Sequence, residues 1–189
     1  MGICQGGTSQ QQTIYFEENF ADNSKGWVLG TEWQIGPAKA SSGEGYGGPD
    51  PGLDNSVTND NGVAGVVIGG NAATTATHGW YWLESPTIDL SAATGTAWLQ
   101  FRRWLNSDYT PYMQNAVEVW DGNSWVQVWV TGSSAGIQDS AWELVKYDIG
   151  QYKNNAFKVR FGFLVGSTGV FTVSSWNVDD VLIANVVCP

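Results

Sequence analysis

Basic side chains are scarce in this sequence. Its 189 residues include 8 Lys and Arg against 18 Asp and Glu, which gives a net charge of −10. This balance argues against nucleic acids and anionic membrane surfaces as partners, because both attract positively charged protein surfaces. No apolar run is long enough for a membrane span, so we expect no membrane insertion. The opening residues lack the basic and apolar regions of a signal peptide, and we interpret the chain as an excised mature domain.

Histidine and cysteine, which carry much of enzyme and metal chemistry, are also rare. The chain has one histidine, His78, and two cysteines. A Ser-His-Asp arrangement has a single candidate base here, with no nucleophile motif beside it. A zinc site needs more His or Cys ligands, and the tightly spaced Glu-x-Asp-x-x-Glu pattern of jelly-roll glucanases is absent. We therefore expect an accessory or binding domain, not an enzyme.

The two cysteines, Cys4 and Cys188, stand at opposite ends of the chain. In a jelly-roll the first and last strands are often antiparallel neighbours, so residues near the two ends can face each other. The register that pairs the cysteines also sets Glu17 against Ser175. We expect a disulfide between the cysteines, which implies an oxidising compartment. The alternative is two free thiols.

Glycine and tryptophan are abundant. The chain has 24 Gly and 11 Trp, and only 14% of its residues are charged. This composition is typical of a β-protein with long glycine-rich loops. The length fits one domain with a sizeable core. We expect a polar leader over residues 1–12 and a single domain over 13–189.

Short strands separated by turn residues are expected along the whole chain. Alternating residues predict a strand at 96–105, and the turn at 121–124 predicts a hairpin of 116–120 and 125–130. Residues 36–62 form a long irregular region, which in a compact domain is usually functional or pinned by something. Other strands are expected at 13–20, 63–68, 142–148, 157–165, 170–174 and 175–184. This pattern predicts an all-β fold, a two-sheet antiparallel jelly-roll β-sandwich.

The last expected strand contains two adjacent carboxylates, Asp179 and Asp180. Aspartate is a poor strand former, and successive strand side chains point to opposite faces. One of the two should therefore point inward, where an unpaired carboxylate is costly. A bound cation removes that cost, which predicts a hard-metal site, first of all for calcium. The alternative is a solvated pair at a sheet edge.

Calcium takes six to eight oxygen ligands from carboxylates, backbone carbonyls and water. Glu17 in the first strand and Asp54 in the long loop can join Asp179 and Asp180 in such a set. Asp60 either adds to this site or builds a second one. We expect a structural ion that fixes the long loop and the two end strands, and the sequence leaves calcium and sodium open.

The order of several short motifs carries a family resemblance. These motifs are Phe16-Glu17, Gly26-Trp27, Trp33, residues 51–54 before a Gly-rich apolar strand, residues 83–90, and residues 178–181. Over about residues 13–185 the chain resembles the MAM-type jelly-roll, and more closely the MAM-like domains of secreted bacterial proteins, such as the accessory domain of immune-inhibitor-A-type metallopeptidases. The resemblance implies a jelly-roll with a structural calcium or sodium ion, used in adhesion or as an appendage of a secreted enzyme. By that resemblance, matches to the family's acids are Glu17, Asp54, Asp179 and Asp180.

Aromatic residues form a second candidate site. Sugar-binding jelly-rolls stack pyranose rings on exposed Trp and Tyr and use nearby polar side chains for hydrogen bonds. Most Trp of such a chain belong to the core, but strand alternation leaves some of them outside it. The candidate ligand-binding residues are Trp80, Trp82, Trp104, Asn106, Asp108, Tyr109 and Tyr112.

The only basic cluster is Arg102-Arg103, whose side chains should point to opposite faces of a strand. We expect one of them to pair with an acid such as Glu118 on a neighbouring strand, in a structural role.

Together these features predict a non-catalytic, calcium-binding module for adhesion or targeting, secreted or on the surface of a bacterial cell. Its partner is expected to be an extracellular glycan or protein. Two alternatives stay open: a carbohydrate-binding module of a secreted enzyme, and an assembly or interaction domain.

Overall fold

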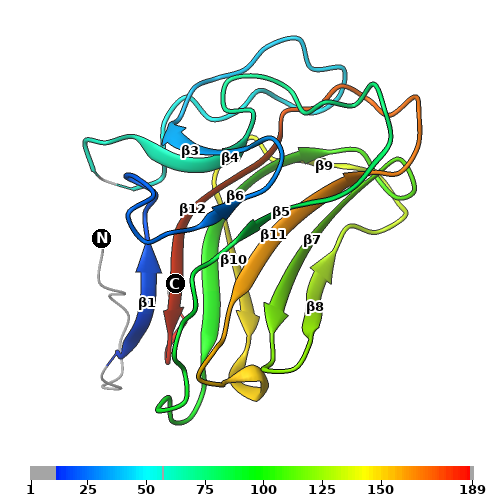
Figure 1. Cartoon of the computed structure of the whole chain (residues 1–189). Coiled ribbons are helices and arrows are strands. Elements are labelled where there is room, and N and C mark those ends of the chain that lie inside the picture. Colours follow the sequence, from blue (N-terminus) through cyan, green and yellow to red (C-terminus); the bar gives the residue numbers. More distant parts are fainter. Residues whose placement is uncertain (1–11, 57, 188–189) are drawn as a thin grey trace.

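Two antiparallel β-sheets pack face to face in the computed structural model, which describes residues 12–56 and 58–187 (Figure 1). This confirms the predicted all-β, two-sheet sandwich. Among the described residues, no helix is long and apolar enough to span a membrane. The elements are β1 (Ile14–Glu18), β2 (Val28–Leu29), β3 (Trp33–Pro37), β4 (Gly62–Val66), β5 (His78–Glu84), β6 (Trp98–Ser107), β7 (Met113–Trp120), β8 (Trp125–Val130), β9 (Ile137–Gln138), β10 (Glu143–Asp148), the 3-10 turn η1 (Gly150–Tyr152), β11 (Val159–Val165) and β12 (Ser175–Ala184).

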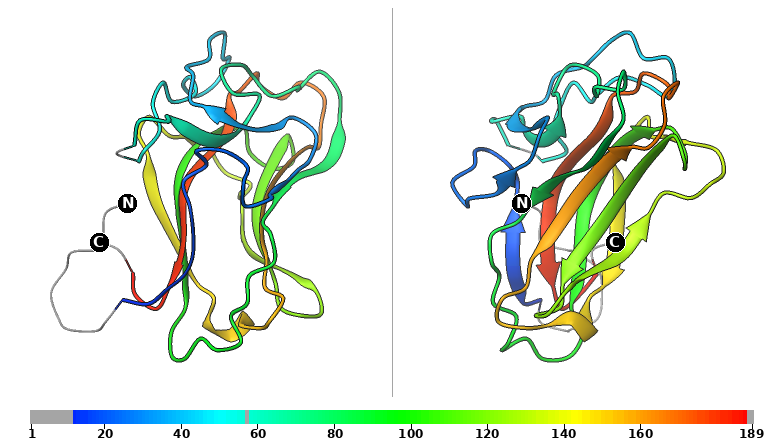
Figure 2. Two further views of the ribbon diagram at one scale, coloured as in Figure 1. Left: turned by 60° about the vertical axis from the view of Figure 1, so that its left-hand side comes forward. Right: turned by 45° about the vertical axis from the view of Figure 1, so that its right-hand side comes forward.

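The strand order brings the two ends of the chain together in one sheet. The seven-stranded sheet has the order β10-β6-β12-β4-β3, with β1 also paired to β12 and β9 to β6. The five-stranded sheet has the order β2-β5-β11-β7-β8. Figure 2 shows these two layers from two further sides. Because β1 and β12 pair antiparallel, the expected neighbourhood of the first and last strands is confirmed.

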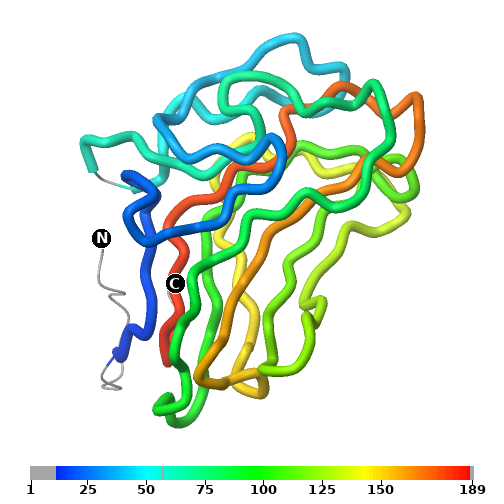
Figure 3. The backbone as a smooth tube through the Cα atoms, in the orientation of Figure 1, coloured from blue at the N-terminus to red at the C-terminus, as the bar shows by residue number. Residues whose placement is uncertain are grey.

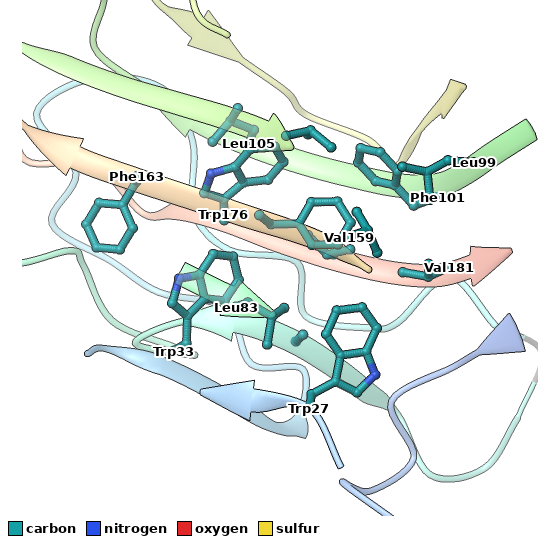
Figure 4. Packing of buried hydrophobic residues seen from close by; sticks show 14 of the residues in the cluster. Trp27, Trp33, Leu83, Leu99, Phe101, Leu105, Val159, Phe163, Trp176 and Val181 are labelled. Carbon is teal, nitrogen blue, oxygen red and sulfur yellow. The ribbon is translucent and has the colours of Figure 1, made fainter. Parts of the chain in front are cut away.

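Aromatic rings fill the space between the two sheets. Trp176 on β12 is fully buried and lies 6.0 Å from Phe161 on β11, whose ring lies 4.8 Å from Phe101 on β6. Trp27, just before β2, and Trp33, the first residue of β3, belong to the same cluster (Figure 4). Each such side chain stabilises the fold by about 1.5–3 kcal/mol through burial alone. The core therefore joins the two sheets through large rings that come from both of them.

Strand β12 departs from strict alternation at Asp180. Trp176 and Val178 before it and Val181 after it all pack in the core. The register against β6 shifts after Asp179, and Asp180 has a φ of 48°. This is a β-bulge, which inserts one extra residue into a strand. One of the two aspartates, Asp179, is buried as predicted, but its carboxylate faces the long loop and not the space between the sheets, because the bulge turns both aspartates toward that loop.

The register between β1 and β12 differs from the expected one. Glu17 lies opposite Leu182, and not opposite Ser175. The register is set by which side chains of β1 face inward, where Phe16 and the buried Glu18 meet Trp27. The predicted disulfide partners, Cys4 and Cys188, lie outside the described residues.

Three long loops gather at one end of the sandwich, at the top of Figure 3. They comprise residues 38–61, 67–77 and 166–174, and backbone hydrogen bonds link them, such as Gly45 to Thr172 and Ala72 to Val173. Residues 170–174 therefore pair with loops, and the strand expected there is not present. The remaining predicted strands are found within a few residues of their expected bounds.

Candidate functional sites on the two outer faces

The carboxylate of Asp179 fastens the long loop to the seven-stranded sheet. Asp179 is fully buried, and its Oδ2 accepts hydrogen bonds from the backbone N–H of Asn55 at 2.8 Å and of Ser56 at 3.3 Å. Its Oδ1 accepts the N–H of Asp180 at 2.7 Å. Both oxygens are thus engaged by amide donors, as expected for a buried carboxylate. Asp179 acts as an anchor for the turn at residues 55–56.

Asp180 holds the same turn from beside the bulge. Its Oδ2 accepts a hydrogen bond from Asn55 Nδ2 at 2.7 Å. Because the bulge turns both aspartates toward the loop, the adjacent residues Asp179 and Asp180 both hold the loop by hydrogen bonds. The sequence signal for this arrangement was the acidic pair itself, inside an otherwise apolar strand.

Four aspartates form what we call the acidic corner: Asp54, Asp60, Asp179 and Asp180. Burial raises the pKa of Asp179 to about 7, and the charge of Asp180 adds to the rise. Burial also raises the pKa of Asp54, and the charges of Asp60 and Asp180 contribute. A hydrogen bond from Thr58 lowers the pKa of the half-buried Asp60. None of the three ion pairs found among the described residues includes these aspartates.

Glu17 is placed beside this corner but not bound into it. It is half-buried, and its backbone carbonyl accepts a hydrogen bond from Lys25 Nζ. Its neighbour Glu18 is the more constrained residue, because its carboxylate accepts the N–H groups of Asn19 and Phe20 and the indole N–H of Trp27, each at 3.0 Å. Glu18 therefore organises the turn after β1, a role that the sequence analysis did not assign.

The predicted metal ligands do not form a complete coordination site among the described residues. Across residues 12–56 and 58–187, no group of three or more His, Cys, Asp or Glu side chains is arranged to hold a metal ion. Asp179 also has both oxygens occupied by amide donors. The acidic corner thus supplies negative charge that a cation could neutralise, while the loop itself is already held by hydrogen bonds.

A second buried carboxylate, Asp50, also holds the long loop, and sequence reasoning missed it as a site residue. Asp50 is 1% exposed; its Oδ1 accepts Asn177 Nδ2 at 2.6 Å and its Oδ2 accepts the N–H of Gly69 at 2.9 Å. Burial raises the pKa of Asp50 to about 7. In the sequence Asp50 is one of several acidic residues in the long loop, and nothing there indicates that it is buried.

The long loop closes over part of the outer face of the seven-stranded sheet. Trp104 donates its indole N–H to the carbonyl of Pro49 at 3.0 Å, and Asn106 accepts the N–H of Gly48 at 2.9 Å. Asn106 is fully buried. These two candidate ligand residues therefore hold the loop in place.

The other predicted ligand residues fall into two further places. Asp108 accepts the backbone N–H of Tyr109 at 2.9 Å and of Phe171 at 3.2 Å, which ties loops together. Tyr109 and Tyr112 contact each other edge to face at 5.4 Å. Trp80 and Trp82 lie instead on β5, in the other sheet. The structure thus divides the seven candidates among three separate places.

The outer face of the five-stranded sheet bears a row of stacked side chains that we call the tryptophan column. Trp80 stacks on Trp82 at 4.8 Å with an interplanar angle of 20°. The guanidinium of Arg160 lies 4.0 Å from the ring centre of Trp82 and 4.0 Å from that of Trp125. Trp120 contacts Trp125 edge to face at 5.6 Å. All four tryptophans are partly exposed.

The register of the sheet explains how the column fits. Trp82 lies opposite Gly162, which in turn lies opposite Ala116. A Cβ atom added to Gly162 would lie 2.2 Å from Cε3 of Trp82, so the ring rests directly on the backbone of β11. Arg160 lies opposite Glu84, which is two residues after Trp82 on β5. Trp80 and Arg160 therefore approach Trp82 from opposite sides.

Two ion pairs complete this face. Arg160 donates Nε and Nη2 to Oε2 of Glu118 at 2.8 and 2.5 Å, and Lys158 bonds Glu84 at 2.7 Å. The expected pairing of Glu118 with Arg102 or Arg103 is wrong, because β6 and β7 belong to different sheets. Arg103 binds Asp139 instead, at 2.8 Å.

The two outer faces differ in whether a loop lies over them. In the right-hand view of Figure 2, β5, β11, β7 and β8 lie in front, and no described segment crosses them. Partly exposed aromatic rings beside polar side chains are typical of ligand-binding surfaces. Trp120, Trp125 and Arg160 were not among the predicted site residues, since a hairpin sequence does not tell which of its residues face outward across a bulge.

Comparison with known proteins finds distant structural likenesses. No protein-family model and no curated protein matches this chain. Two cleaved adhesin domains of Lys-gingipain from Porphyromonas gingivalis match with 18% and 16% identity, over 92% and 90% of this chain and 98% of each domain, with TM-scores of 0.42 and 0.43. TmCBM61, solved in complex with β-1,4-galactotriose, matches with 12% identity over 88% of this chain and 97% of its own, with a TM-score of 0.48. At these values the likenesses carry no argument about what this chain binds.

Proposed function

We propose that this chain is a non-catalytic binding module that recognises a glycan through the tryptophan column. The observation that carries the proposal is a row of four partly exposed tryptophans on a sheet face that no described segment covers. Such a module suits a secreted or cell-surface bacterial protein with a role in adhesion or targeting. A protein ligand is the alternative occupant of this face.

Sugar rings match the chemistry of the column. One side of a pyranose ring presents C–H groups, which pack favourably on the electron-rich face of an indole ring, and its hydroxyl groups need polar partners nearby. Lys158, Glu84, Arg160 and Glu118 provide such partners between the rings. The two glutamates are held in ion pairs with basic side chains, which suits hydrogen bonding more than proton transfer to a leaving group.

The proposal is tested by measuring polysaccharide affinity in native affinity gels and by calorimetry. We expect the Trp80→Ala variant to bind at least tenfold more weakly than the unaltered protein. Trp98→Ala, which removes a half-buried tryptophan from β6 in the other sheet, is the matched control and should bind normally. Unchanged affinity of the Trp80 variant would contradict the assignment of this face.

Calcium binding at the acidic corner is a second candidate function. It is favoured by one observation: the charge of Asp180 adds to the raised pKa values of Asp54 and Asp179, and no basic side chain among the described residues forms an ion pair with these aspartates. We propose that a calcium ion binds through Asp54 and Asp180, with backbone oxygens and water completing its shell. Sodium is the alternative ion.

Thermal unfolding with calcium and with EGTA tests this second candidate. Calcium at ten times its dissociation constant adds about 1.4 kcal/mol to the free energy of unfolding. Asp180→Asn should remove that gain without distorting the bulge, because Asn tolerates the positive φ of this position. Replacing sodium chloride by choline chloride distinguishes sodium. An unfolding midpoint that is the same in calcium, EGTA and choline would show that the corner holds no ion.

A further inference from the structure

We infer that the tryptophan column selects an uncharged, linear glycan that runs diagonally over β5, β11 and β7, stacking on Trp80 and Trp120 at its two ends and hydrogen-bonding to Arg160 and Glu118 between them. This inference rests on the proposed function and adds the chemical class of the ligand and the role of each residue.

The stacking positions follow from which ring faces are still free. Trp82 has Trp80 on one face and the guanidinium of Arg160 on the other, so neither face can receive a sugar. Trp125 has one face on Arg160. Among the described residues, Trp80 contacts a single aromatic ring, and Trp120 meets Trp125 only edge to face. Trp82 and Trp125 therefore act as positioning residues, and Trp80 and Trp120 present the faces on which a ring can stack.

The hydrogen-bonding groups lie midway along the column. Both bonds between Arg160 and Glu118 use Oε2 of the glutamate, and they engage Nε and Nη2 of the arginine. Nη1, with its two N–H groups, and Oε1 are not used in these bonds, which leaves donors on the arginine and an acceptor on the glutamate. Hydroxyl groups of a sugar chain can accept from the first and donate to the second. The side chains are 19% and 13% exposed, so both can be reached from solvent.

Charge on this face favours an uncharged ligand. The protein as a whole carries a net charge of −10. On the column face, however, each basic group is matched by one acid, Arg160 by Glu118 and Lys158 by Glu84. An acidic polysaccharide would meet no unpaired cation here and would be repelled by the remaining negative charge of the molecule. A neutral chain avoids both costs.

The size of the face requires more than one sugar ring. The column runs diagonally from Trp80 on β5 over β11 to Trp120 on β7, two steps of about 4.8 Å between neighbouring strands. Trp82 and Ala116 both lie level with Gly162; Trp80 stands two residues before Trp82 and Trp120 four residues after Ala116, so the two rings are also separated by roughly 20 Å along the strands. Trp80 and Trp120 are therefore too far apart to contact one ring, and a short oligosaccharide is the smallest ligand that reaches both.

The inference is tested with two sets of polymers in the same calorimetric assay. The neutral set is hydroxyethylcellulose, β-1,4-galactan and galactomannan, and the acidic set is polygalacturonate and alginate. We expect binding to at least one neutral polymer and to neither acidic one. Trp80→Ala and Trp120→Ala should each weaken that binding about tenfold, while Trp98→Ala should not. Near-UV circular dichroism confirms that the variants remain folded.

The other outcomes separate this inference from the proposed function. Binding to an acidic polymer that Trp80→Ala and Trp120→Ala weaken overturns the inference and leaves the proposed function intact. Neutral binding that both tryptophan variants retain overturns the inference together with the assignment of this face. Binding to none of the polymers overturns both. Arg160→Lys provides a further check: it keeps the charge but loses the planar group between two rings, and it should weaken neutral binding with the fold intact.

Discussion

At the scale of single residues, the two buried carboxylates that hold the long loop, Asp50 and Asp179, make stability depend on pH. The folded-state pKa of Asp50 is about 7, above its ordinary value of 3.8. An acid with a raised pKa holds its proton longer in the folded state, so stability falls as pH rises from about 4 to about 7 and is level above that. Asp179 adds a dependence of the same sign.

The substitution Asp50→Asn should remove the part of this pH dependence that arises from Asp50. The buried Oδ1 of Asn177 has no hydrogen-bond donor, so rotating that amide lets it accept from the new side-chain amide. We expect the variant to be more stable than the unaltered protein at pH 8, by on the order of 4 kcal/mol, since each pKa unit corresponds to about 1.4 kcal/mol. Urea unfolding at pH 5 and pH 8 measures this. A variant that loses stability equally at both pH values would show that hydrogen bonding, and not ionisation, governs this site.

Gly162 is the residue on which the tryptophan column depends. An added Cβ would lie 2.2 Å from the ring of Trp82, so Gly162→Ala must push that ring away from β11. We expect a loss of about 1–3 kcal/mol, typical of overpacking, together with a weaker near-UV circular dichroism signal. Gly79→Ala on β5 is the matched control, because its added Cβ meets nothing within 4 Å. Equal effects of the two changes would argue that the ring is not held by this contact.

At the scale of elements, Glu18 determines how β1 leads into the core. Its carboxylate accepts three N–H groups, including the indole of Trp27, and it is 3% exposed. Glu18→Gln replaces one accepting oxygen by a donor and should cost about 1–3 kcal/mol in the free energy of unfolding. Glu17→Gln, one residue earlier, should change it by less than about 0.5 kcal/mol. Guanidinium unfolding of the two variants compares them directly, and a larger loss at Glu17 would reverse the roles assigned here.

The strands that the sequence predicted well are those with strong local signals. The hairpin of β7 and β8 has alternating residues around a Gly-Asn turn, and β12 has a run of β-branched and aliphatic residues. The register between β1 and β12 was not predicted, because it depends on which side chains the assembled core accepts. The bulge at Asp180 was missed for a related reason: a sequence with two adjacent aspartates is compatible both with strict alternation and with an inserted residue.

The candidate sites show the same division between local and assembled features. Asp54, Asp179 and Asp180 were correctly expected near one another, since the acidic pair and the long loop are visible in the sequence. The column was found only in part, through Trp80 and Trp82, because Arg160 and Trp125 reach it from β11 and β8. Contacts across three strands cannot be derived before the strand order is known.

At the scale of the whole molecule, the two outer faces have opposite characters. The long loop covers part of the seven-stranded sheet, where Trp104 and Trp142 donate their indole N–H groups to loop carbonyls at 3.0 and 3.1 Å. The five-stranded sheet has no such cover among the described residues. The composition predicted a β-sandwich with many tryptophans. Which sheet keeps its tryptophans uncovered depends on where the long loop lies.

The pairing of Ile14 with Ala184 across β1 and β12 also bears on how this domain could be grafted. Opposed residues of antiparallel strands have Cα atoms about 5 Å apart, so the described domain starts and finishes at nearly the same point. It can therefore be spliced as one block into a surface loop of a carrier protein without stretching either junction. Because both junctions lie on the seven-stranded sheet, the splice would leave the strands that bear the tryptophan column unaltered.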